Sequence, residues 1–213
     1  MKHVPHLVIG APWEEEEDLS VSIVQWRHLT KVLRMKRGNQ VTYTDGLGRV
    51  GRGELGHMTI ERGEEWFVER EHELDVTVAP PSNKDRQRFM VEKLSELGVA
   101  RLQWLRTELG KNRIQPPPKV FSWVLAAVEQ SRGAWLMEVS TSLVGWDDLE
   151  GEVVVCDLDG GRSTPTARTI VVGPEAGWAE GEIPEEHSRW SLGTNVLRVE
   201  TAAIIAAARV IGT

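Results

Sequence analysis

Two short apolar runs, at residues 153–156 and 169–172, constrain the fold of this 213-residue chain most strongly. They consist almost entirely of Val and Ile, without the alternating polar positions of a strand that has one face in water. Such runs are typical of strands covered on both faces of a parallel sheet. Further strands are expected at 76–79 and 99–105, and helices at 84–97 and 119–130. This alternation predicts an α/β layer structure.

The helix expected after Asn83 carries the clearest boundary signals. Met90, Leu94 and Leu97 recur at helical spacing and predict one buried face. Asn83 is suited to the N-cap position, and Gly98 is suited to the position just after the last helical residue. We therefore expect a helix between the strands at 76–79 and 99–105.

The first 72 residues have a different character. Residues 41–44 are rich in β-formers, residues 45–48 (Asp-Gly-Leu-Gly) suit a turn, and 49–55 and 66–68 suit further short strands. The acidic run at 14–18 is typical of a solvated loop. We expect a small β-barrel or sheet module at 1–72 and an α/β domain at 73–213.

Several classes of protein are disfavoured by composition. The longest apolar run, 202–208, is too short to span a membrane, and the first residues lack a signal-type apolar core. A single cysteine, Cys156, excludes an internal disulfide and a zinc site built on cysteine pairs, and the six histidines lack metal-binding spacing. We expect a cytoplasmic protein without a metal or a membrane partner.

The charge distribution leaves two interpretations open. Net charge is −7, yet residues 27–52 hold seven basic residues against one acid, and residues 84–113 hold eight against four. These segments are either solvated faces or patches that bind nucleic acid.

The last predicted helix, residues 200–211, is apolar nearly all round. Such a helix must be buried on most sides, and a small domain does not bury an edge helix that fully. A homodimer interface is therefore a reasonable hypothesis.

Two glycine-bearing loops are the candidate ligand site. One, residues 171–178, directly follows a predicted buried strand, and the other, residues 191–201, leads into the last helix. Ligands of open α/β sheets bind at the carboxyl ends of strands, although ordinary turns also need glycine. Neither loop matches a dinucleotide or P-loop pattern.

Five motifs occur in the order found in one family. Residues 173–178 resemble G-P-E-G-G-F, followed by Glu180 or Glu182, and residues 192–202 resemble L-G-x-x-I-L-R-x-E-T-A. Residues 93–99 resemble K-x-x-E-L-G-V, residues 129–131 are E-Q-S, and 28–38 resemble H-L-x-x-V-L-R-x-x-x-G. Together they resemble the RsmE-type ribosomal RNA uridine-N3 methyltransferases of the SPOUT superfamily.

The resemblance implies a SPOUT-type α/β domain with a trefoil knot, preceded by a PUA-like β-barrel that binds RNA. It implies a homodimer that uses S-adenosyl-L-methionine to methylate N3 of a uridine in 16S rRNA of the small ribosomal subunit. The alternatives are a SPOUT methyltransferase that acts on another RNA and a ribosome assembly factor without catalysis.

The resemblance also implies roles for individual residues. Arg198 is the candidate catalytic cation, and Glu175 or Glu200 the candidate base, unless water suffices. The alternative for Arg198 is an ion pair with Glu200 or Glu175 that shapes the loop, and the alternative for both glutamates is N-capping or loop bracing. Cofactor-binding residues are expected to be Val172, Gly173, Pro174, Glu175, Gly177, Leu192, Gly193, Val196 and Leu197. RNA-binding residues are expected to be Arg27, His28, Lys31, Arg34, Lys36, Arg37 and Arg132. The sequence departs from the family at Ala176, where glycine is usual, and at Leu109, where arginine is common.

Overall fold

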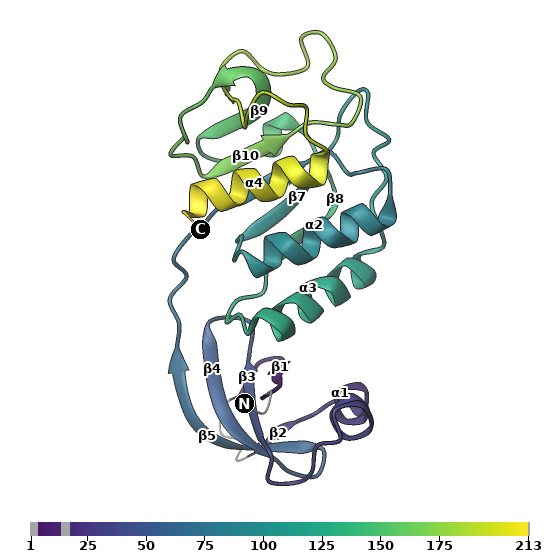
Figure 1. Cartoon of the computed structure of the whole chain (residues 1–213), viewed down its shortest axis with the longest axis vertical. Coiled ribbons are helices and arrows are strands. Elements are labelled where there is room, and N and C mark those ends of the chain that lie inside the picture. Colours follow the sequence, from purple (N-terminus) through teal and green to yellow (C-terminus); the bar gives the residue numbers. More distant parts are fainter. Residues whose placement is uncertain (1–3, 14–17, 213) are drawn as a thin grey trace. The chain divides into compact units, whose positions relative to one another are not determined.

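A computed structural model describes residues 4–13 and 18–212 of the chain. It divides into two compact units: Met1–Glu71 with Val128–Leu136, and His72–Ala127 with Met137–Thr213. Each unit is built on its own sheet (Figure 1). Of the predicted acidic loop, residues 14–17 lie outside the described residues, and Asp18 is already the first residue of a strand.

The first unit is a curved half-barrel. Among its described residues, five strands follow the order β1-β3-β4-β5-β2. They are β1 (His6–Val8), β2 (Asp18–Ser20), β3 (Gln40–Thr44), β4 (Arg49–Leu55) and β5 (Thr59–Phe67). The strands predicted at 41–44 and 49–55 are confirmed. The prediction at 66–68 covered only the end of β5, because most residues of β5 are polar and their strand conformation is fixed by pairing with β4.

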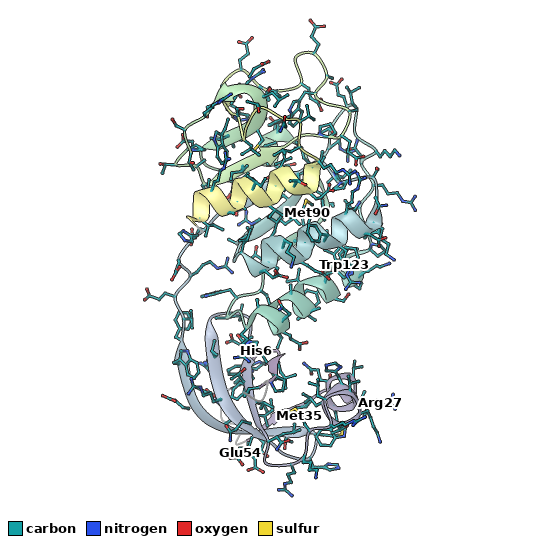
Figure 2. All side chains as sticks on the ribbon, viewed as in Figure 1. His6, Arg27, Met35, Glu54, Met90 and Trp123 are labelled. Carbon is teal, nitrogen blue, oxygen red and sulfur yellow. The ribbon has the colours of Figure 1, made fainter. Side chains whose placement is uncertain are left out.

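A short helical segment, α1 (Ile23–Arg27) followed by η1 (His28–Val32), covers one end of this half-barrel. Ser22 caps it in a reciprocal arrangement with Gln25. Leu29 is fully buried in the half-barrel core, while most of its neighbours are exposed. The segment is therefore fixed through few side chains and presents the others to solvent (Figure 2, Arg27).

Three polar side chains form a partly buried cluster in the same half-barrel. The Tyr43 hydroxyl donates to Glu65 (2.9 Å), which also accepts from Nε (2.7 Å) and Nη2 (2.8 Å) of Arg62. Burial raises the pKa of Tyr43 to about 12. The Tyr43 ring lies so close to Gly51 that a side chain there would collide with it, which explains a glycine inside β4.

The second unit contains the predicted parallel sheet. Within residues 72–212, six strands follow the order β11-β9-β10-β6-β7-β8, all parallel. They are β6 (Asp75–Val78), β7 (Arg101–Leu105), β8 (Glu138–Val144), β9 (Val153–Gly161), β10 (Thr169–Val172) and β11 (Ser188–Trp190). Every residue of β10 is buried, as its apolar run predicted. The trefoil knot stays a prediction.

Within its described residues, the second unit also contains three α-helices: α2 (Lys84–Glu96), α3 (Pro117–Ser131, whose last residues belong to the first unit) and α4 (Val199–Ile211). A short 3-10 helix, η2 (Trp146–Asp148), precedes β9. The Asn83 side chain caps α2 by accepting from the backbone N–H groups of Asp85 and Arg86, as predicted. Gly98 has a φ of +78°, which confirms the predicted end of the helix. Met90 and Leu94 are fully buried, with α2 packed beside α4 (Figures 1 and 2).

Helix α4 packs on α2, β6 and β10 through one face. The buried residues of α4 are Val199, Glu200, Ala202, Ala203, Ala206 and Ala207. Thr201, Ile204, Ile205 and Ala208 remain half-buried along the helix. Packing within the unit thus accounts for much of its apolar character and leaves a partly exposed apolar stripe. No described helix has both the length and the apolarity needed to cross a bilayer.

Candidate active site

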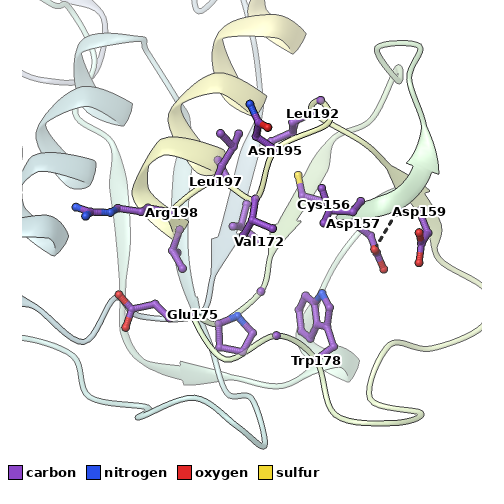
Figure 3. Close-up of a pocket in the computed structure, with 18 of the residues that line it drawn as sticks. Cys156, Asp157, Asp159, Val172, Glu175, Trp178, Leu192, Asn195, Leu197 and Arg198 are labelled. Carbon is purple, nitrogen blue, oxygen red and sulfur yellow. Dashed lines mark hydrogen bonds between the residues drawn. The ribbon is translucent and has the colours of Figure 1, made fainter.

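Both glycine-bearing loops border one cavity of about 570 Å³ at the carboxyl ends of β9 and β10. All nine residues expected to bind a cofactor line it, and so does Arg198. The sequence analysis missed Arg86, Cys156, Asp157, Leu158, Asp159, Trp178, Asn195, Val199 and Ala202, which also line it. The loops therefore form a single site rather than two separate turns (Figure 3).

Gly173 is required by a neighbouring aromatic ring. A Cβ on Gly173 would collide with the indole of Trp178, whose ring forms part of the cavity wall. Trp146 holds this ring from another side, with the two ring centroids 5.5 Å apart. The absence of a side chain at Gly173 thus allows Trp178 of the same chain, rather than a ligand, to approach closely.

Residues 174–177 form a tight turn at the cavity rim. The Gly177 N–H donates to the Pro174 carbonyl (3.0 Å), and Gly177 has a φ of +81°, which favours glycine. Ala176 is exposed and is not among the residues with a positive φ. Alanine at this position, where the family usually has glycine, therefore causes no backbone strain.

A carboxylate braces this loop against a second one. Glu182 accepts hydrogen bonds from the N–H groups of Ala179 (2.8 Å) and Glu108 (2.7 Å). The sequence motif was followed by either Glu180 or Glu182. Glu182 is the one that holds the segment after Trp178 in place. Leu109, beside Glu108, is exposed to solvent.

The candidate carboxylates meet at Arg86, on the first turn of α2. Arg86 Nη1 lies 2.7 Å from Glu175 Oε1, and Arg86 Nε lies 3.7 Å from Glu200 Oε1. The Ser82 hydroxyl also donates to Glu175 (2.6 Å). Hydrogen bonding to Ser82 and the charge of Arg86 lower the pKa of Glu175. Glu200 is buried, with one oxygen lacking a hydrogen-bond partner among the described residues, and does not line the cavity.

Arg198 occupies the N-cap position of α4 at the edge of the cavity. Glu175 and Glu200, which were its expected ion-pair partners, lie within ion-pair distance of Arg86 instead. Among the described residues, no carboxylate lies within ion-pair distance of the exposed Arg198 guanidinium. The site thus presents an unpaired cation. Figure 3 shows Arg198 on the side of the cavity away from Asp157 and Asp159.

The opposite wall of the cavity is acidic (Figure 3). Asp157 and Asp159 come from the part of β9 that extends beyond the predicted strand. Asp157 accepts from Arg189 Nη1 (2.9 Å) and from the Asp159 N–H (3.2 Å). Burial raises the pKa of the neighbouring Cys156 thiol to about 12, so this thiol stays protonated at neutral pH.

The expected RNA-binding residues lie in the first unit. Six of them, Arg27, His28, Lys31, Arg34, Lys36 and Arg37, are exposed on α1, η1 and the segment that follows. Arg132 is also exposed, but its guanidinium donates to the Val4 carbonyl (3.0 Å). Within the described part of the chain, no group of three or more His, Cys, Asp or Glu side chains is arranged to hold a metal ion.

Comparisons with known proteins match most of this chain to one family. Residues 69–211 match the family model described as "RNA methyltransferase domain". The chain is 27% identical, over 233 aligned positions, to ribosomal RNA small subunit methyltransferase E of Synechocystis sp., covering 96% of this chain and 76% of that protein.

Two solved structures share the fold over nearly the whole chain. A ribosomal RNA small subunit methyltransferase E from Neisseria gonorrhoeae, bound to S-adenosyl methionine, superposes with a TM-score of 0.84 at 23% identity, covering 97% of this chain and 96% of that one. A predicted RNA methyltransferase from Thermotoga maritima gives a TM-score of 0.76 at 26% identity, covering 97% of each chain.

Proposed function

The chain belongs to the RNA methyltransferase domain family, and we propose that it is an RsmE-type enzyme that transfers a methyl group from S-adenosyl-L-methionine to N3 of a uridine in 16S rRNA. The observation that carries this proposal is the single cavity between the two glycine loops, with the unpaired Arg198 at its edge. Residues 73–213 would be the methyltransferase domain, and 1–72 the RNA-binding domain.

The cavity fits the cofactor in size and chemistry. A volume of about 570 Å³ lies within the range of roughly 300–1,000 Å³ typical of small-molecule sites. Val172, Leu192 and Leu197 supply apolar walls for a nucleoside. Asp159 suits the cationic ammonium of the methionine part, whereas Asp157 is already paired with Arg189. When bound, the cofactor supplies a methyl group on a positively charged sulfur.

Arg198 would favour the reactive form of the substrate. Uracil N3 holds its proton between two carbonyls and becomes nucleophilic when the proton leaves. The negative charge then spreads onto O2 and O4, where a fixed guanidinium stabilises it. The N3–methyl bond forms as the bond between sulfur and methyl breaks. An Arg198 not engaged by a carboxylate has its full charge available for this task.

The geometry favours Glu175 over Glu200 as a candidate base. Glu175 borders the cavity, whereas Glu200 is buried below it. However, hydrogen bonding to Ser82 and the charge of Arg86 lower the pKa of Glu175, which makes its carboxylate a weak base. The arrangement therefore supports a positioning role for Glu175 and leaves the N3 proton to water.

The remaining partners follow from the same premise. The exposed cations of α1 and η1 suit RNA phosphates, and the partly exposed stripe of α4 suits a second copy of this chain. We propose a homodimer that acts on the small ribosomal subunit in the cytoplasm.

The test is the Arg198→Ala variant, with Arg168→Ala as its control. Arg168 is a half-exposed arginine that precedes β10, at the opposite edge of the sheet. We expect Arg198→Ala to lower kcat by roughly 100-fold or more, with the Kd for S-adenosylmethionine little changed. Mass mapping of rRNA identifies the methylated base. An unchanged kcat would remove Arg198 from the chemistry.

The competing function is a ribosome assembly factor without catalysis. It predicts no S-adenosylmethionine binding in calorimetry at millimolar cofactor. The intact cavity and the unpaired Arg198 favour the enzyme.

A further inference from the structure

A basic surface on the second unit lies outside the cavity and has no role in the site described above. It consists of Lys84, the first residue of α2, Lys119, on the first turn of α3, and Arg113, in the segment that leads to α3. We call these three residues the α2–α3 basic patch. Residues 106–119 around it hold four basic side chains against one acid, in a chain whose net charge is −7.

The fold brings the patch together. Helices α2 and α3 follow β6 and β7, two neighbouring parallel strands, so both helices start at the carboxyl edge of the sheet (Figure 1). The buried Gln87 side chain donates to the carbonyls of Pro81 (2.7 Å) and Arg113 (2.8 Å). Gln87 thereby ties the segment before α3 to the start of α2.

The patch holds repelling charges that the described residues do not neutralise. Proximity to the Lys84 ammonium lowers the pKa of Lys119. No described carboxylate lies within ion-pair distance of Lys84, Arg113 or Lys119, although Asp85 is nearby. By contrast, Arg88 on the same helix is paired with Glu92 at 2.7 Å. Like charges held together in this way favour binding of an anion.

The patch adjoins the rim of the cavity. The start of α2, where Lys84 lies, meets this rim through Ser82 and Arg86, which both contact Glu175. A Cβ on Gly110 would lie 3.5 Å from the Pro174 side chain, so the segment that carries Arg113 also borders this rim. An anion bound at the patch would therefore lie beside the opening through which a base enters.

We propose that the α2–α3 basic patch binds backbone phosphates of the RNA next to the nucleotide that enters the cavity. The inference rests on the proposed function and adds a binding surface on the catalytic unit to the one expected on α1 and η1. Phosphate contacts of this kind fix the register of the RNA without reading its sequence.

The test is the double variant Lys84→Gln/Lys119→Gln, with Arg168→Gln as the control for lost positive charge. Arg168 lies at the amino end of β10, whereas the patch lies at the carboxyl ends of the strands of the same sheet. Filter binding to small ribosomal subunits that carry unmodified 16S rRNA is measured over a range of KCl concentrations. The logarithm of the association constant falls linearly with the logarithm of the salt concentration, and each lost phosphate contact makes this slope less steep by roughly 0.7–0.9. For two lost contacts we expect the slope to be less steep by about 1.5. If the two proteins bind equally at about 1 M salt, this difference in slope gives the variant a roughly 20-fold higher Kd at about 150 mM salt.

Methylation kinetics and a rescue variant separate binding from folding. We expect the double variant to raise KM for RNA, with kcat and the Kd for S-adenosylmethionine unchanged, and Lys84→Arg/Lys119→Arg to restore the slope. A slope equal to that of wild type, or a loss shared with Arg168→Gln, would overturn the patch alone. A wild-type protein that neither binds nor methylates these subunits would overturn the proposed function and the patch together.

Discussion

Replacing Arg86 tests how the site is held together, because this side chain bridges both glutamates of the two loops. The Arg86–Glu175 contact (2.7 Å) joins side chains that are each about one-third exposed, whereas Glu200 on the other side is 8% exposed. Exposed pairs contribute roughly 0.2–1 kcal/mol. Removing one partner of a buried pair costs about 3–5 kcal/mol, because the remaining charge is left alone.

The Arg86→Gln variant should fall between these limits. Water reaches Arg86, and its 3.7 Å separation from Glu200 is long, so we expect a loss of about 2 kcal/mol of unfolding free energy. For a chain of this size that corresponds to a melting temperature lower by roughly 4–8 °C. In the Glu200→Gln background the buried charge is absent, and Arg86→Gln should lower the unfolding free energy by only about 0.5 kcal/mol.

The assay is a double-mutant cycle of Arg86→Gln and Glu200→Gln by urea denaturation, with S-adenosylmethionine absent. Arg88→Gln is the matched control, since it removes an arginine of the same helix from an exposed pair with Glu92. A coupling energy of about 1.5 kcal/mol is expected. Equal costs of Arg86→Gln in the two backgrounds would refute the reasoning that Arg86 stabilises the buried Glu200.

Three further changes test other parts of the structure. Burial lowers the pKa of His6, so as the pH falls the unfolded chain binds a proton at about pH 6.5, and the folded chain does so only at a lower pH. The unfolding free energy of wild type should therefore fall from pH 7.5 to pH 5.5. Urea denaturation should show a smaller fall for His6→Gln. Gly51→Ala should cost roughly 1–3 kcal/mol because its Cβ meets the Tyr43 ring, and a melting temperature like that of wild type would contradict this close contact. The Cys156 thiol lines the cavity, and burial raises its pKa to about 12, so it should react with a disulfide reagent at pH 8 much more slowly in the native protein than after denaturation; equal rates would contradict the raised pKa.

Local pattern was sufficient where a single segment carried the signal. The apolar runs at 153–156 and 169–172 predicted buried parallel strands, and Asn83 and Gly98 marked the ends of α2. These features depend on neighbours in the sequence, so they are readable from it. The strand β5 was underestimated, since its polar residues adopt strand conformation only through pairing with β4.

The candidate site divides in the same way between sequence and tertiary structure. The two glycine loops and Arg198 were identified from their motifs, and all of them border the cavity. The partner of the glutamates was not, because Arg86 lies 89 residues from Glu175 in the chain and meets it only when α2 and the loop pack together. The acidic wall at Asp157 and Asp159 was missed because it needs β9 to run past its apolar part.

The sequence by itself determined the buried strands β9 and β10, both ends of α2 and the two glycine loops of the candidate site, because hydrophobic period, caps and glycines act over a few residues. Only the tertiary structure decided that Arg86 binds the glutamates, that Arg198 is left unpaired, and that Trp178 is the reason for Gly173. Charge pairing and close packing depend on distances across the fold, which the order of residues along the chain does not contain.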